Sequence, residues 1–316
     1  LAVSLAALWL GLALLTAVPE VGALKAGPAN PAAPTAPLHV CKSGCTYSSV
    51  QAAISAAAPN DVIKVASGTY TDVHEFYVWS KPANSARQVA YITKSLTLAG
   101  GYTATDWTTP DPDANPTVLD AKGEGRVIQV WEAGANTPIT VTLRGLRITG
   151  GDTSAGGAYN PVYGGGIYAR AAHLILEDCR VEGNQAIGTS GDRGGGGIYA
   201  FQSTVAITET VLTDNQADRD GGGLYLFDTP LTLIRSEIIS NSAQSHAGGV
   251  YAYNFPSTVY VEKTRFHDNR AQFGGGGLSL NGPNGTLIDT VFTANRANGG
   301  AALASNLGTL EVTGGT

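Results

Sequence analysis

The residues of this chain best placed to do chemistry are two acidic side chains in equivalent positions of consecutive sequence repeats. Asp178 and Glu209 each lie six residues before an asparagine that recurs along the chain. If the repeats stack at the spacing of neighbouring β-strands, the two carboxyl groups lie about 5 Å apart, near the separation that retaining glycosidases use. The same column continues with Arg235, Lys263 and Asp289. A column of alternating charge is typical of a solvated ion-pair ladder, so we favour that interpretation over a catalytic pair.

Two further pairs of aspartates could supply oxygen ligands for Ca²⁺. Asp111 and Asp113 lie in the segment TPDPDANP, and Asp218 and Asp220 lie in ADRDGGG. Neither segment contains a complete calcium-loop motif, and Asp also stabilises turns through hydrogen bonds to its own backbone. The five histidines are scattered, and none recurs in register. We therefore expect solvated turn aspartates, no metal site and no cofactor.

A third group of candidates consists of aromatic residues that recur after each glycine run. In GGGGIYAF, alternation along a strand sends Ile198 and Ala200 to one side and Tyr199 and Phe201 to the other. Two outward columns follow, one of Tyr168, Tyr199, Tyr225 and Tyr251, and one that includes Phe201, Phe227 and Tyr253. Such a strip could bind a glycan chain or a protein partner. The rings could instead stack on one another, or lie beneath the insertion 151–163.

The element that must position these columns is a repeat aligned on one asparagine. The segments GNQA, DNQA, SNSA, DNRA and ANRA recur at intervals of about 26 to 31 residues. The recurring asparagines are Asn184, Asn215, Asn241, Asn269 and Asn295. A side-chain amide can bond to equivalent amides above and below it, so we expect an asparagine ladder. The glycine runs indicate turns that need positive φ or leave no room for a Cβ atom.

Apolar residues occupy fixed offsets from this asparagine, at the third and the eighth residue before it. Each unit thus holds about three short strands, too few to bury a face alone, so neighbouring units must stack. The sequence predicts an all-β fold, a single-stranded right-handed parallel β-helix solenoid with a short N-terminal capping helix. Cys179 falls in a column of small inward residues, and we expect a free, buried thiol there.

The N-terminal part of the chain indicates export. An apolar run followed by Val21-Gly22-Ala23 predicts a signal peptide over residues 1–23, and an uncleaved membrane anchor is the alternative. A Pro/Ala-rich linker is expected over 24–40. Because export permits disulfides, we expect Cys41 and Cys45 to form one. The lack of methionine and the strand pattern that breaks off at 310–316 predict a chain truncated at both ends, from which a C-terminal anchor could be missing.

Residues 41–75 are expected to form an N-terminal cap and first coil, and residues 76–316 the remaining coils. Within the cap, 47–58 has apolar residues at helical spacing, including Val50, Ala53 and Ile54. A solenoid exposes unpaired strand edges at its ends. We therefore expect this helix to cover the open end.

The cap segment SSVQAAISAAAPNDVIKVASGTY resembles the N-terminal coil of the pectin-lyase-like superfamily of right-handed parallel β-helices. The later units, with GGGIYA-type starts and the tetrads FHDN and FTAN, are similar to the GGxI and FxxN repeats of polymorphic outer membrane proteins. The earlier tetrads LTDN, IISN and VEGN lack the aromatic residue. The resemblance implies an exported, surface-associated and often adhesive protein. For the enzymes of the superfamily it implies cleavage of acidic polysaccharides by clustered carboxylates, with Ca²⁺ and a basic residue.

Charge narrows the classes of function. A net charge of −6 and only 14% charged residues give no basic patch for a phosphate backbone, so we expect no nucleic-acid partner. We favour a secreted or surface-exposed monomer, extracellular or on an outer membrane, that binds a polysaccharide or a surface protein without catalysis. The alternatives are a polysaccharide lyase or glycoside hydrolase of that superfamily, and a passive surface spacer.

Overall fold

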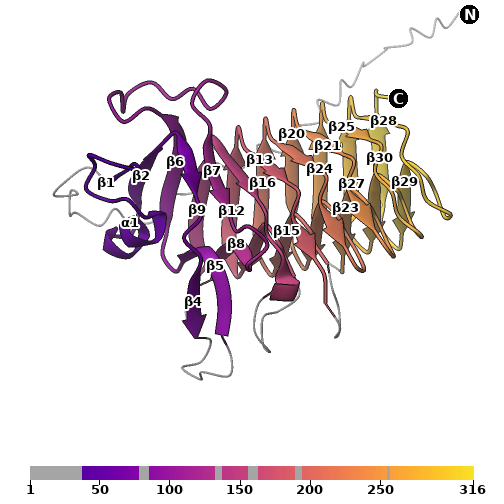
Figure 1. Cartoon of the computed structure of the whole chain (residues 1–316). Coiled ribbons are helices and arrows are strands. Elements are labelled where there is room, and N and C mark those ends of the chain that lie inside the picture. Colours follow the sequence, from indigo (N-terminus) through magenta and orange to yellow (C-terminus); the bar gives the residue numbers. More distant parts are fainter. Residues whose placement is uncertain (1–37, 78–84, 132–136, 156–162, 189–193, 255–256) are drawn as a thin grey trace, which may run out of the picture. The chain divides into compact units, whose positions relative to one another are not determined.

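The protein folds as a right-handed parallel β-helix in which the coils stack in chain order. The structure is a computed structural model, and it describes residues 38–77, 85–131, 137–155, 163–188, 194–254 and 257–316. Figure 1 shows the strands following one another along the stack from indigo to yellow. Equivalent strands of successive coils pair in parallel. They form four sheets, called A, B, C and D here. The fold predicted from the repeat is therefore confirmed.

Sheets A and B lie on either side of one corner of the coil. Sheet A consists of β1 (Leu38–Val40), β2 (Asp61–Ala66), β6 (Leu96–Tyr102), β9 (Ile139–Arg144), β12 (Ala172–Glu177), β16 (Thr204–Thr208), β20 (Leu231–Ile234), β24 (Thr258–Glu262), β27 (Asn284–Ile288) and β30 (Leu310–Thr313). Sheet B consists of β3 (Gly68–Tyr70), β7 (Thr117–Asp120), β10 (Leu146–Thr149), β13 (Arg180–Glu182), β17 (Val211–Thr213), β21 (Glu237–Ile239), β25 (Arg265–His267) and β28 (Val291–Thr293).

Sheets C and D complete the coil. Sheet C consists of β4 (His74–Tyr77), β5 (Ser85–Ile92), β8 (Arg126–Val130), β11 (Ile167–Arg170), β15 (Ile198–Phe201), β19 (Leu224–Phe227), β23 (Val250–Tyr253), β26 (Leu278–Asn281) and β29 (Leu303–Asn306). Sheet D consists of β14 (Gln185–Ala186), β18 (Gln216–Ala217) and β22 (Ser242–Ala243). Among the named strands, only β4 and β5 pair antiparallel. A 3₁₀ turn spans Thr153–Ala155.

The corner between sheets A and B repeats one local structure in coil after coil. Its first residue has a φ of 46° to 52°, which is the left-handed region; these residues are Asp178, Glu209, Arg235, Lys263 and Asp289. The next residue is small and buried, and its side chain bonds to the neighbouring coil. The hydroxyl of Thr210 accepts the N–H of Cys179 at 3.2 Å, and the hydroxyl of Ser236 accepts the N–H of Thr210 at 3.2 Å. A ladder of hydroxyl groups thus satisfies backbone donors where the chain leaves sheet A.

Helix α1 (Val50–Ala56) lies at the indigo end of the stack in Figure 1. It begins at Ser49, whose hydroxyl accepts the N–H of Ala52 at 3.4 Å, an ordinary N-cap. Its buried residues Val50, Ala53 and Ile54 join the main core. The helix is shorter than the span 47–58 expected from the apolar spacing.

The chain just before the helix differs from the expected linker. Leu38–Val40 pair with β2 in sheet A, so these last three residues of the expected linker 24–40 belong to the β-helix. The remainder of that linker and the expected signal peptide, residues 1–23, lie outside the described residues. A disulfide joins Cys41 and Cys45. No helix in the described part of the chain is both long enough and apolar enough to cross a membrane.

The core fills the interior of the coils with the inward side chains of sheets A, B and C. Phe266 and Phe292 stack on each other in successive coils, with ring centroids 4.8 Å apart. Cys179 lies in this core as a free thiol, as the repeat register predicts. Burial raises the pKa of the thiol to about 12, so it stays protonated at neutral pH.

Candidate ligand-binding groove

The asparagine column turns the chain from sheet B into sheet D and so fixes the position of the residues that follow it. The side-chain amide nitrogen of each asparagine donates to the side-chain oxygen of the next, at 3.1, 3.0, 3.0 and 2.9 Å along the five residues Asn184, Asn215, Asn241, Asn269 and Asn295. The same oxygen accepts the backbone N–H of the preceding asparagine, for example at 3.1 Å between Asn215 and Asn241. The amide nitrogen also donates to a carbonyl of the previous coil, as Asn241 does to Leu212 at 2.9 Å. The turn is therefore held rigidly in every coil.

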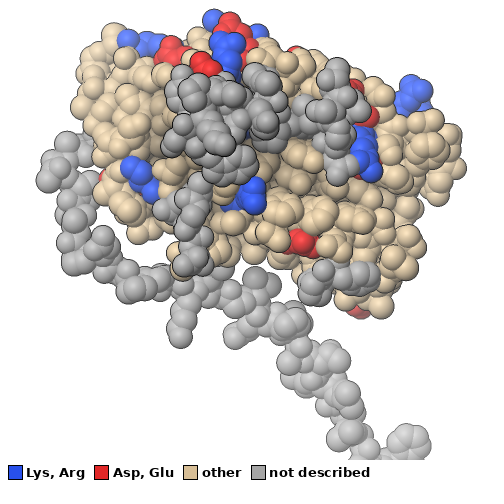
Figure 2. Space-filling view, turned by 90° about the horizontal axis from the view of Figure 1, so that it is seen from below, with Lys and Arg blue, Asp and Glu red and all other residues tan. Residues whose placement is uncertain are grey.

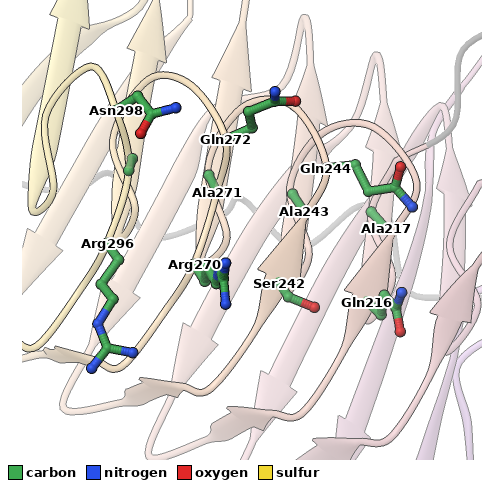
Figure 3. A pocket seen from close by; sticks show the side chains of 11 residues that line it. Gln216, Ala217, Ser242, Ala243, Gln244, Arg270, Ala271, Gln272, Arg296 and Asn298 are labelled. Carbon is green, nitrogen blue, oxygen red and sulfur yellow. The ribbon is translucent and has the colours of Figure 1, made fainter.

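A groove of about 690 Å³ lies directly beyond these turns. It is lined by Gln216, Ala217, Ser242, Ala243, Gln244, Arg270, Ala271, Gln272, Arg296, Ala297 and Asn298. In each coil the residue after the asparagine contributes to one wall, the alanine lies between the walls, and the next residue contributes to the other wall. Figure 3 shows the arginines and Gln216 on one side and Gln244, Gln272 and Asn298 on the other. The groove thus crosses several coils, and the pattern of its lining residues repeats from coil to coil.

The walls of the groove differ in charge along its length. Arg270 and Arg296 are exposed and lie opposite each other in parallel register in successive coils. Arg296 approaches Asp268 at 3.8 Å. On the other wall, the amide of Gln244 donates to Asp218 at 3.1 Å. Uncharged amides and two guanidinium groups therefore present many hydrogen-bond donors to a ligand in the groove.

The tyrosine column does not form an exposed strip. Tyr168, Tyr199, Tyr225 and Tyr251 do point away from the main core, but each is only 5 to 7% exposed. The residue before each glycine run covers the column: Tyr163 stacks on Tyr199 with centroids 4.3 Å apart, and His246 stacks on Tyr251 at 5.5 Å. At Gly194 a Cβ atom would lie 2.2 Å from the Tyr225 ring. The expectation that these four tyrosines bind a ligand on an open surface is therefore wrong, because the chain itself occupies that surface.

The second aromatic column remains partly open but uses its ring faces internally. Phe201 and Phe227 are half-buried, and Tyr253 is 37% exposed. Successive rings are tilted towards each other, with centroids 5.3 and 5.4 Å apart. The guanidinium of Arg170 lies between the rings of Trp131 and Phe201, at 4.9 and 5.3 Å. Because the faces contact neighbouring side chains, little ring face is left for a sugar to stack on.

The acidic pair Asp178 and Glu209 lies in a second hollow, together with Asp113 of the loop between β6 and β7. Two adjoining depressions of about 220 and 320 Å³ include both acids among their lining residues. The pKa of the Asp178 carboxyl is raised, mainly by burial. The nearby carboxyl groups of Asp113, Glu209 and Asp111 raise it further through charge repulsion. Glu209 pairs with Arg235 at 3.0 Å, and both side chains are more than half exposed. The structure therefore brings the pair Asp111 and Asp113 close to the pair Asp178 and Glu209, although the two pairs are far apart in the sequence. The ion pair between Glu209 and Arg235 is one step of the expected charge ladder.

The other aspartate pair considered for Ca²⁺ is occupied by protein donors. Asp220 is buried and accepts both the backbone N–H of His246, at 3.0 Å, and its ring Nδ1, at 2.9 Å. Arg219 lies 3.3 Å from its second oxygen. Within the ranges that the structure describes, no three His, Cys, Asp or Glu side chains converge as metal ligands. Figure 2 shows Lys, Arg, Asp and Glu in small separate groups on the face it displays.

The groove residues themselves were not among the site residues expected from the sequence. Their signal is present, since the first and third positions after the ladder asparagine are mostly long and polar: Gln, Ser or Arg at the first, and Asp, Gln or Asn at the third in the last four units. A small residue flanked by two long polar ones, repeated in register, is what a trough with polar walls requires.

Comparisons with known proteins show similarity in fold. No family model and no curated protein sequence matches the chain. A crystal structure of the pectin methylesterase from Aspergillus niger, in penultimately deglycosylated form, is similar with a TM-score of 0.51 and 15% identity, covering 90% of this chain and 86% of that one. The deglycosylated form of the same enzyme gives a TM-score of 0.47 at 15% identity. The first similarity supports the parallel β-helix fold, and the fold is what the chain shares with that enzyme.

Proposed function

We propose that this protein is a non-enzymatic, exported recognition protein that binds an extended glycan in the groove beside the asparagine column. The observation that carries the proposal is the repeated wall structure of the groove. Successive coils offer equivalent polar side chains at the strand spacing of about 4.8 Å. A polymer with a repeating polar unit can contact such a surface several times in the same way, whereas a compact ligand would use only part of it.

Several features support glycan over other polymers. Exposed Gln244, Gln272 and Asn298 carry both donors and acceptors, which suits hydroxyl groups. The rigid asparagine turns pre-organise the walls, which lowers the ordering cost of binding. The glycine-run and FxxN repeats resemble those of exported surface proteins, which favours an extracellular or surface location. A surface protein as partner and a passive spacer are the alternatives that the experiment separates.

The test is a glycan array probed with the wild-type chain and with Gln244→Ala/Gln272→Ala. We expect wild type to bind a set of extended glycans and the double variant to lose at least about tenfold in affinity, because two hydrogen-bonding groups disappear from one wall. Gln202→Ala is the control, since it removes one exposed amide from a different corner of the coil. Unchanged binding by the double variant would place the ligand elsewhere. Absence of any glycan binding would leave the protein-partner and spacer alternatives.

Glycoside hydrolysis at the acidic hollow is a second candidate, and one observation favours it. The pKa of Asp178 is raised, so this carboxyl is biased towards the acid form, and it lies one coil away from Glu209, which pairs with Arg235. A reducing-end assay on every array hit tests this candidate. New reducing ends that disappear in Asp178→Asn would establish catalysis and overturn the non-enzymatic proposal.

A further inference from the structure

We infer that the groove selects anionic glycans, and that Arg270 and Arg296 together bind one acidic group of the chain. This inference rests on the proposed function and adds the chemical class of the ligand. Arg270 and Arg296 are bridge partners in parallel register, one coil apart. Like charges directly opposite each other on neighbouring strands are destabilising. A negatively charged group bound between the two arginines would relieve this repulsion.

The rest of the molecule shows how a stacked arginine pair is normally compensated. Arg147 and Arg180 are also register partners in successive coils. Glu182 lies between them and forms an ion pair with both, at 2.8 Å from Arg147. Among the described residues, this arginine pair outside the groove is thus neutralised by one of the protein's own carboxylates.

The pair in the groove lacks such a partner. Considering the described ranges alone, no carboxylate lies within 4.0 Å of Arg270, and its guanidinium has no hydrogen bond to the protein. Arg296 has only Asp268, at 3.8 Å, with the side chains 72% and 47% exposed. An exposed contact of this length contributes little. Two adjacent guanidinium groups with free donors match the geometry of a carboxylate or sulfate group.

The opposite wall and the far end of the groove favour a glycan that bears carboxylate or sulfate groups. Gln272 and Asn298 lie on the wall opposite the arginines and are exposed, so they can bond to sugar hydroxyls. At the other end Asp218 holds Gln244, and its negative charge disfavours an acidic group there. An anionic glycan would therefore lie with an acidic residue beside Arg270 and Arg296 and with hydroxyl contacts along the remaining wall.

The experiment measures affinity by biolayer interferometry for three polymers that share one backbone: dextran, carboxymethyl dextran and dextran sulfate. Poly-glutamate and the anionic and neutral glycans of the array are included as further probes. The variants are Arg270→Gln and Arg270→Gln/Arg296→Gln. Arg265→Gln is the charge-matched control, because Arg265 is an exposed arginine of sheet B outside the groove.

We expect anionic glycans to bind more tightly than their neutral counterparts, with carboxymethyl dextran and dextran sulfate telling which acidic group is preferred. Arg270→Gln should weaken anionic binding by about tenfold or more, the double variant further, and Arg265→Gln by less than about threefold. Neutral glycans should be insensitive to all three. Affinity should fall with added salt in wild type and less steeply in the double variant.

Four outcomes would overturn the inference. Anionic binding that survives the double variant would show that the arginines do not hold the ligand. Arginine-dependent binding of poly-glutamate without binding of any glycan would make the ligand a peptide. If neutral glycans bind and anionic ones do not, the inference fails and the proposed function stands; if no glycan binds at all, both fail.

Discussion

The asparagine column and the tyrosine column are both built from one residue per coil, yet they differ in what determines their surroundings. Each asparagine bonds to groups at fixed offsets in neighbouring repeats, so its environment is the same in every coil. The residue before the glycine run lies against the tyrosine column and changes from coil to coil, from Tyr163 through Gly194 and Asp220 to His246. Alternation therefore tells on which side of a strand a residue lies, but not whether another segment covers that side.

The largest effect should come from breaking the asparagine column in its middle. Asn241→Ala removes the acceptor of two bonds from Asn215 and the donor to Leu212 and Asn269, leaving buried groups unpaired. We expect a loss of about 4 kcal/mol in the free energy of unfolding, measured by urea titration followed by circular dichroism. The matched variant Asn295→Ala lies at the more exposed end of the column and removes three such bonds instead of four, so it should lose less. Equal losses at the two positions would contradict a cooperative ladder.

The tyrosine column should matter for stability and not for binding. Tyr225→Ala removes a ring that is 7% exposed and should cost about 3 kcal/mol, whereas Phe227→Ala, from the half-buried column, should cost about 1 kcal/mol. Urea titration measures both, and the glycan array should give wild-type binding for both. Loss of glycan binding in folded Phe227→Ala would return recognition to the aromatic surface.

The column of buried hydroxyl residues between sheets A and B should tolerate a threonine in place of Cys179. Burial raises the pKa of Cys179 from 9.0 to about 12, so stability is fully present below about pH 9 and declines as pH rises towards the folded-state pKa. The slope for one such group is at most about 1.4 kcal/mol per pH unit. Cys179→Thr, which copies Thr210 in the next coil, should fold and should show a shallower decline between pH 9 and 10. Identical alkaline profiles would mean that the thiol is not the group responsible.

The smallest effect should come from the acidic hollow. Asp178→Asn keeps a residue type that tolerates positive φ and removes a charge facing Asp113 and Glu209. We expect stabilisation within about 0.5 kcal/mol at pH 7. Because the folded-state pKa of Asp178 is raised, the carboxyl begins to destabilise the fold once pH exceeds the unfolded value of 3.8, so the difference should vanish below about pH 4. Marked destabilisation at pH 7 would mean that the carboxylate has a structural partner.

The sequence was sufficient for the features that recur in register. The coil, the inward columns and the burial of Cys179 follow from alternation and stacking, which are local rules. It was not sufficient for the acidic hollow, where Asp111 and Asp113 reach Asp178 through a loop that belongs to no repeat. The cover over the tyrosines lies at a fixed position of the repeat, but its residue type changes from coil to coil. The groove is different, because its two polar columns recur at fixed offsets from the asparagine and are therefore present as a signal in the sequence.

The most direct test of the central claim is a crystal structure of the chain with the tightest-binding oligosaccharide from the array. We expect the sugar between the two walls, in contact with Gln244 and Gln272 on one side and with Arg270 on the other. Sugar bound against Tyr253 and Phe273, or in the hollow of Asp178 and Glu209, would contradict the claim that the groove beside the asparagine turns is the recognition surface.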